Sequence, residues 1–191
     1  MGSKGEKTKE AICDASYALF SQNGFRAVTM KDICEACHMS RGGLYRHYGS
    51  TQEIFEEILS GMANRENTFF IDNMDKNISA KAILAEELKL LQAEMLDPKT
   101  SLSYAIYEYS IVCSDRYMIE LNTRAKKRWH DFIKYGIARG EFREVDIEVM
   151  TEHILYIYQG IRMWSRVIPI EETTVTGITE KIRKDLEREE A

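Results

Sequence analysis

Apolar side chains recur every three or four positions along most of this chain, which is the spacing of one face of an α-helix. Gly24, Gly49, the pair Asp97-Pro98 and Gly140 divide this pattern into segments of helical length. The pattern predicts an all-α protein of about nine helices. The longer helices are expected at about residues 7–23, 51–74, 79–96, 99–114, 116–139, 146–167 and 173–188.

Two shorter helices are predicted within Thr29–Tyr48. Thr29 can cap the first helix, and Asp32 three residues later completes a weaker form of the capping box. Ser40 can cap the second helix in the same way, so the turn between the two helices falls at Cys37–Met39. Two capped helices joined by a short turn are typical of a helix-turn-helix.

The second of these helices is basic and aromatic, as expected of a recognition helix in a DNA major groove. It contains no acidic residue and presents Arg41, Gly42, Gly43, Tyr45, Arg46 and His47. Arginine side chains can reach guanine edges or phosphates, and glycines let backbone N–H groups approach phosphates closely. Tyr45 and Tyr48 fit two roles, because each can donate to a phosphate or pack in a core.

Several motifs in order along the chain resemble the DNA-binding domain of the TetR family of transcriptional regulators. They are S-R-G-G-L-Y-R-H-Y and G-S-T-Q-E-I-F within Thr29–Phe55, preceded by A-S-Y-A-L-F-S-Q-N-G-F at Ala15–Phe25. The resemblance covers about residues 8–60. Beyond residue 60 only the general helical character and the length agree.

The resemblance implies two domains. These are an N-terminal three-helix DNA-binding domain at 1–50 and a larger helical domain at 75–191 for effector binding and dimerisation, connected by a fourth helix at 51–74. It implies a homodimer through residues 146–188, although those helices would equally suit closure of the monomer's own core. It also implies a palindromic double-stranded DNA operator and release of a repressor by a small-molecule effector.

The predicted DNA contacts fall into two groups. Arg41, Tyr45, Arg46 and His47 are the candidates for reading bases, and the candidates for phosphate contact are Thr29, Lys31, Ser40, Gly42, Gly43, Tyr48 and Thr51. Two positions depart from the family pattern, because His38 stands where glycine is frequent and Thr51 where lysine is frequent. Residues 1–6 are expected to form a flexible arm whose lysines can touch phosphate or remain a simple tail.

A candidate effector pocket rests on aromatic residues of the second domain. Its residues are Tyr104, Tyr107, Glu108, Trp129 and Tyr158, which would suit an apolar ligand or an ordinary core. The predicted helix at 99–114 is apolar nearly all round and is therefore expected to be central and buried. Glu108 within it either selects a cationic or hydrogen-bonding ligand, or forms an internal ion pair or lies at a partly exposed edge. The basic run Arg124–Arg128 is interpreted as a solvated helix face.

The charge distribution agrees with DNA binding at the N-terminal end. The net charge is −5, yet residues 1–50 hold seven Lys and Arg against five Asp and Glu. A mildly basic head on an acidic body suits a protein that touches DNA at one end. The sequence shows no signal-peptide pattern and no long apolar run, so we expect a cytoplasmic protein without a membrane partner.

Two other function classes remain open at this stage. Cys34, Cys37 and His38 have the C-x-x-C-H spacing of haem attachment, and Cys and His also bind zinc. Small apolar packing by free thiols explains the cysteines as well. The other class is a helical ligand-binding module that no longer binds DNA. No catalytic motif is recognisable, so neither an enzyme nor a cofactor is predicted.

Overall fold

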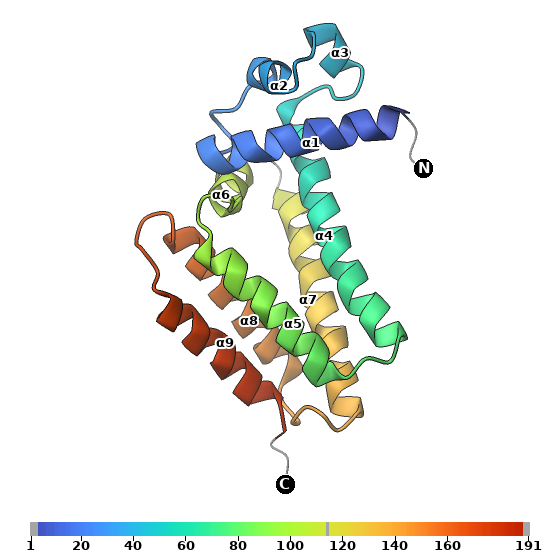
Figure 1. Cartoon of the computed structure of the whole chain (residues 1–191), viewed down its shortest axis with the longest axis vertical. Helices are drawn as coiled ribbons and strands as arrows, with labels where there is room; N and C mark the ends of the chain where they lie inside the picture. Colours follow the sequence, from blue (N-terminus) through green and yellow to red (C-terminus); the bar gives the residue numbers. More distant parts are fainter. Residues whose placement is uncertain (1–3, 114, 189–191) are drawn as a thin grey trace. The chain divides into compact units, whose positions relative to one another are not determined.

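The computed structural model describes residues 4–113 and 115–188, which form nine α-helices and no β-strand (Figure 1). The predicted all-α fold is confirmed. The helices are α1 (Lys4–Asn23), α2 (Met30–Ala36), α3 (Arg41–Tyr45), α4 (Thr51–Asp75), α5 (Ala80–Leu96), α6 (Ser103–Val112), α7 (Asp115–Ala138), α8 (Ile147–Trp164) and α9 (Glu172–Leu186). Within the described residues, none of these helices combines the length and apolarity needed to cross a bilayer.

Two helix boundaries differ from the prediction in an informative way. α1 begins at Lys4, so residues 4–6 of the expected arm are helical, while residues 1–3 lie outside the described residues. α6 covers only Ser103–Val112 of the predicted helix at 99–114, because a turn follows Pro98 and delays its start, and Ser114 lies outside the described residues. Pro98, which follows α5, therefore separates α5 from α6 by more residues than the apolar pattern predicted.

The chain divides into two compact units. The first comprises Met1–Met62 and Lys99–Arg116, and the second comprises Ala63–Pro98 and Tyr117–Ala191. These units differ from the predicted domains at 1–50 and 75–191, because α6 packs with the N-terminal helices. α4 is a single continuous helix whose first half belongs to the first unit and whose second half belongs to the second.

The first unit has an aromatic core. The ring of Phe55 on α4 lies 4.9 Å from that of Phe20 on α1 and 5.0 Å from that of Phe25, measured between centroids. Tyr109 of α6 joins them with its ring 5.2 Å from that of Phe25. Edge-on and tilted contacts of this kind are favourable beyond the area that they bury.

The expectation that α6 is buried all round is wrong. Ala105 and Tyr109 are fully buried, but Tyr107, Ile111 and Val112 are exposed by 54%, 62% and 50%. The composition of α6 cannot reveal this arrangement, because an apolar residue on every side hides which face is packed.

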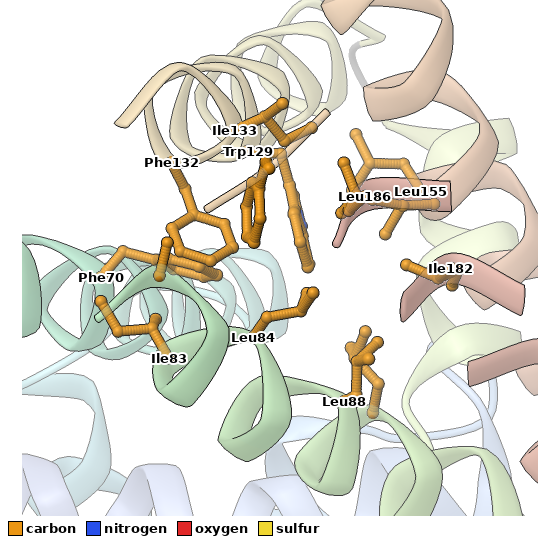
Figure 2. Close-up of a cluster of buried hydrophobic side chains, with 14 of the residues drawn as sticks. Phe70, Ile83, Leu84, Leu88, Trp129, Phe132, Ile133, Leu155, Ile182 and Leu186 are labelled. Atoms are coloured by element: carbon orange, nitrogen blue, oxygen red, sulfur yellow. The ribbon is translucent and has the colours of Figure 1, made fainter. Parts of the chain in front are cut away.

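The second unit encloses the larger hydrophobic core (Figure 2). In that view Phe70 of α4, Leu84 and Leu88 of α5, and Trp129 and Phe132 of α7 point toward one another. Helix α5 packs against both α8 and α9, which add the fully or largely buried side chains Ile154, Leu155, Val175, Ile182 and Leu186. The apolar face of α9, with Val175, Ile182 and Leu186, is therefore buried inside this unit.

The end of α7 is fixed by a close approach of its backbone to an aromatic ring. Gly140 has a φ of 70° and reverses the chain, so that Phe142 folds back onto the helix. A Cβ atom on Gly136 would lie 2.6 Å from Cγ of Phe142, whose side chain is completely buried. Only glycine therefore fits at position 136 with this ring in place.

We predict that Gly136→Ala destabilises the protein by about 1–3 kcal/mol, because the buried ring of Phe142 has little room to move. Urea denaturation followed by circular dichroism measures this change. Gly177→Ala is the matched control, since a Cβ atom there meets nothing within 4 Å and should be neutral or slightly stabilising. Equal urea midpoints for Gly136→Ala and Gly177→Ala would contradict the close packing of Phe142 against Gly136.

Candidate nucleic-acid interface

A reciprocal cap fixes the start of α2. Thr29 Oγ1 accepts a hydrogen bond from the Asp32 N–H at 3.3 Å, and the Asp32 carboxylate accepts one from the Thr29 N–H at 2.8 Å. Hydrogen bonds from the Thr29 side chain and backbone hold the pKa of Asp32 below its usual value. The predicted capping box is therefore present, and it satisfies two amide groups that the helix leaves without partners.

The turn after α2 depends on a left-handed residue. His38 has a φ of 52°, its N–H donates to the Glu35 carbonyl at 3.2 Å, and the Met39 N–H donates to the Cys34 carbonyl at 2.9 Å. This pair of bonds is the Schellman ending of a helix, in which glycine usually supplies the left-handed position. The turn at Cys37–Met39 was predicted correctly, and histidine adopts its conformation at an energetic cost.

The second helix of the motif, α3, has only five residues and is fixed at its start by Ser40. The Ser40 hydroxyl oxygen accepts a hydrogen bond from the Gly43 N–H at 3.1 Å, as the sequence predicted. Leu44 is completely buried on the inner face, while Arg41 and Tyr45 are exposed on the outer face. The caps and Leu44 thus direct the polar side of α3 outward.

Tyr48 anchors the residues that follow α3. Its side chain is 3% exposed, and its hydroxyl lies 3.4 Å from the sulfur of Cys13 on α1. Nζ of Lys9 lies 4.9 Å from the centre of the Tyr48 ring and 3.1 Å from the carboxylate of Glu57 on α4. Burial raises the pKa of the Tyr48 phenol far above its usual value, so the hydroxyl keeps its proton.

Helix α6 is bonded to the same unit at two further points. The Tyr109 hydroxyl donates to Glu56 Oε1 on α4 at 2.5 Å, and the Glu108 carboxylate accepts the backbone N–H of Arg26 at 3.1 Å. A Cβ atom on Gly24, whose φ is 82°, would overlap the Glu108 carboxylate. Glu108 therefore holds the chain after α1 through a backbone amide, and it forms no ion pair with any residue that the structure describes.

Comparison with known proteins decides the family. The family described as bacterial regulatory proteins, tetR family, matches residues 12–58. The HTH-type transcriptional repressor KstR2 of Rhodococcus jostii (strain RHA1) is 30% identical over 154 residues, which are 78% of this chain and 74% of the relative. The chain belongs to the TetR family.

Solved structures of TetR-family regulators share the fold over nearly the whole chain. KstR2 of Mycobacterium tuberculosis aligns with a TM-score of 0.64 at 20% identity, over 99% of this chain and 97% of that one. A TetR-family regulator from Agrobacterium tumefaciens aligns with a TM-score of 0.78 at 13% identity, over 97% of this chain and 100% of that one. These likenesses support the arrangement of an N-terminal helix-turn-helix followed by a helical C-terminal region.

The predicted DNA contacts of this TetR-family member separate by exposure. The exposed ones, here called the outer face of the helix-turn-helix, are Thr29, Lys31, Ser40, Arg41, Gly42, Tyr45 and Arg46. His47 and Thr51 are half-buried, and Gly43 and Tyr48 are buried. The Gly43 N–H already serves the Ser40 cap and Tyr48 packs as core, so these two have the least access to a phosphate. All of these DNA contacts stay predictions.

The cysteines of this TetR-family chain occur as free thiols. Cys34 is buried, and burial raises the pKa of the Cys13 and Cys37 thiols above their usual value. Protonated thiols are poor metal ligands and poor nucleophiles. Among the described residues, no group of three or more His, Cys, Asp and Glu side chains is placed to hold a metal ion. The haem or redox alternative therefore has no support from these residues.

The five predicted effector-pocket residues do not share one unit. Tyr104, Tyr107 and Glu108 belong to the first unit, and Trp129 and Tyr158 belong to the second. Trp129 is 1% exposed within the large core, and Tyr158 donates a hydrogen bond to the carboxylate of Glu94. That these five residues form one effector pocket stays a prediction.

Sequence inspection missed a group of buried charges in the second unit. Arg128 is 9% exposed and pairs with Glu66 at 2.6 Å, and Arg162 is 7% exposed and lies 3.4 Å from Glu94. Arg128 was included in the solvated basic run of α7. Its position three residues after Ala125, on the apolar stripe of that helix, was the available signal that it points inward.

We predict that His38→Gly raises the free energy of unfolding by about 1 kcal/mol, because glycine adopts the left-handed turn without the clash of a Cβ atom. Urea denaturation measures the change. Asn77→Gly is the matched control, because Asn77 occupies the same position of a Schellman ending after α4 with a φ of 56°. Asparagine tolerates this conformation better, and the Oδ1 of Asn77 also accepts a hydrogen bond from Arg139, so Asn77→Gly should gain less stability or lose some. A loss of stability in His38→Gly would show that the side chain contributes more than the strain costs.

Proposed function

We propose that this protein is a homodimeric transcriptional repressor that reads a palindromic double-stranded DNA operator and is released from it by a small-molecule effector. The observation that carries the proposal is the outer face of the helix-turn-helix. Arg41 and Tyr45 are exposed there on α3, Arg46 is exposed directly after its end, and Leu44 on the opposite side of the helix is completely buried. Such a face suits the major groove, where arginine recognises guanine through two hydrogen bonds.

An exposed apolar surface on α8 supports dimerisation through residues 146–188. On the helix its members recur about every seven residues, or two turns, and others follow directly after the end of the helix: Val149, Tyr156, Ile157, Trp164, Val167 and Ile168. Exposed apolar surface of this extent usually marks an interface between proteins. A two-fold dimer presents two recognition helices, which agrees with a palindromic operator whose half-sites lie about one helical turn apart.

Effector binding would act by shifting a population. A ligand that binds the second unit better in one conformation favours that conformation, and a dimer whose two heads are wrongly spaced loses its operator. No catalytic step is involved in this function. The operator lies on chromosomal DNA, so we place the protein in the cytoplasm, without a membrane partner.

The first experiment is fluorescence anisotropy of the purified protein on the intergenic DNA beside its own gene, with a salt series and an unrelated duplex as competitor. Tight binding that survives the competitor is the expected result. Binding that disappears equally on both duplexes as salt rises would reflect electrostatic attraction only and would contradict specific reading of this DNA.

We predict that Arg41→Ala lowers operator affinity by about 1–3 kcal/mol and relaxes sequence preference, because Arg41 is exposed at the start of α3. Anisotropy titrations on the operator and on a mutated half-site measure both effects. Arg65→Ala, at an exposed arginine outside the helix-turn-helix, is the control and should bind as the unsubstituted protein does. Unchanged affinity in Arg41→Ala would remove this residue from the reading surface.

We also predict that Trp164→Glu dissociates the dimer, because it places a charge in the centre of the exposed apolar surface of α8, where Trp164 is 57% exposed. Sedimentation velocity measures the change in association state. Leu90→Glu on α5 is the matched control, since Leu90 is 50% exposed outside that surface. A Trp164→Glu protein that remains dimeric would place the interface elsewhere.

A further inference from the structure

The second half of α4 and the middle of α7 line a cavity that the predicted effector pocket did not include. Its volume is about 360 Å³, within the range of sites that hold small organic ligands. The α4 side of the cavity is mainly apolar and includes Phe70, Ile71 and Met74. Met74 follows Ile71 by three positions and Phe70 by four, so it lies next to both on the helix surface.

The α7 side of the cavity is cationic. Arg124, Lys127 and Arg128 line it together with a single carboxylate, that of Asp131. Lys127 pairs with Asp131 at 2.5 Å, but the guanidinium of Arg124 donates to the neutral amide oxygen of Asn64 at 2.5 Å. Among the described residues no carboxylate pairs with Arg124, so the cavity retains a positive charge.

Arg128 adds an unused hydrogen-bond donor. One of its terminal nitrogens pairs with Glu66, yet its Nε–H is buried and has no partner among the described residues. The nearby Glu87 carboxyl does not supply that partner. Burial raises its pKa to about 7, so near pH 7 much of it carries no negative charge to balance Arg128. A buried donor without an acceptor is costly, and a ligand oxygen relieves that cost once the Arg128 side chain turns toward the cavity.

We propose that this cavity binds an amphipathic organic anion, a carboxylate carried on an apolar body, and that this compound is the effector. The apolar body lies against Ile71 and Met74, with the buried ring of Phe70 behind them, and the carboxylate faces Arg124 and Arg128. A cation of the same size is disfavoured by the three basic side chains, and a neutral compound leaves the Arg124 charge without a counterion. The effector role rests on the proposed function, whereas the binding of the anion does not.

The position of the cavity on α4 gives the ligand a route to the helix-turn-helix. The same continuous helix that provides Phe70 and Ile71 carries Phe55 in the aromatic core of the first unit. A ligand that favours one placement of α4 over another therefore biases the unit that holds the recognition helix.

The test compares three probes with one eight-carbon chain and different head groups: octanoate, 1-octanol and octylammonium. Isothermal titration calorimetry is performed on the full-length protein without DNA. Octanoate is expected to saturate one site per chain at millimolar concentration or below, at least fivefold more tightly than either other probe. No saturable binding of octanoate, or equal or tighter binding of 1-octanol or octylammonium, overturns the proposal.

Two pairs of variants locate the site. Arg124→Gln should weaken octanoate about tenfold, while Lys134→Gln removes the same charge from an exposed position of α7 outside the cavity and should leave affinity unchanged. Ile71→Ser should weaken octanoate and 1-octanol alike, with Ile78→Ser as its control. Equal effects within each pair would show that octanoate binds somewhere else.

A final titration separates this proposal from the proposed function. Saturating octanoate is added to the protein on its operator, and fluorescence anisotropy records whether operator affinity falls. A fall of fivefold or more supports the effector role, and unchanged affinity overturns that role even if the cavity binds octanoate. A protein that binds no operator contradicts the proposed function, while the DNA-free titration still decides the chemistry of the cavity.

Discussion

A five-residue recognition helix cannot hold its own conformation, and this constraint governs the whole N-terminal unit. Isolated helices of fewer than a dozen residues are unstable in water, because nucleation costs more than a few backbone bonds return. The conformation of α3 therefore comes from outside it: the Ser40 cap, the left-handed turn at His38 and the burial of Leu44 and Tyr48. The aromatic contacts among α1, α4 and α6 hold this unit together. The cap, the turn and the buried side chains position α3 against it.

The bonds of α6 follow from the same need. Glu108 and Tyr109 are neighbours on one helix, and they reach the chain after α1 and the first quarter of α4 respectively. Each bond joins segments that are far apart in the sequence, so together they restrict how α1 and α4 lie against each other. Glu108, which the sequence analysis considered as a residue that selects a ligand, thus contributes to the rigidity of the N-terminal unit.

The sequence predicted the structural features that depend on neighbouring residues and missed those that depend on tertiary packing. The caps at Thr29 and Ser40, the turn at Cys37–Met39 and the helical class follow from residues three or four positions apart, and all are present. The burial of α6 could not be predicted, because its apolar residues surround the helix and give no direction. The partner of Glu108 lies 82 positions away, a distance over which residue spacing carries no information. Arg41 and Arg46 are exposed, as the basic pattern of α3 predicts. Their contact with bases depends on the operator sequence, which the protein sequence does not contain.

The buried charges of the second unit are difficult to explain as a source of stability. Within the part of the chain that the structure describes, Arg128 and Arg162 each keep a buried Nε–H without a partner, although each pairs with a carboxylate through another nitrogen. Replacing buried ion pairs with apolar residues of similar volume is often neutral or stabilising, so ion pairs that leave donors unsatisfied contribute little to folding. Arg128 lies over the ring of Phe70 and lines the cavity between α4 and α7. Its place there is better explained by a ligand that binds in that cavity than by the stability of the unbound protein.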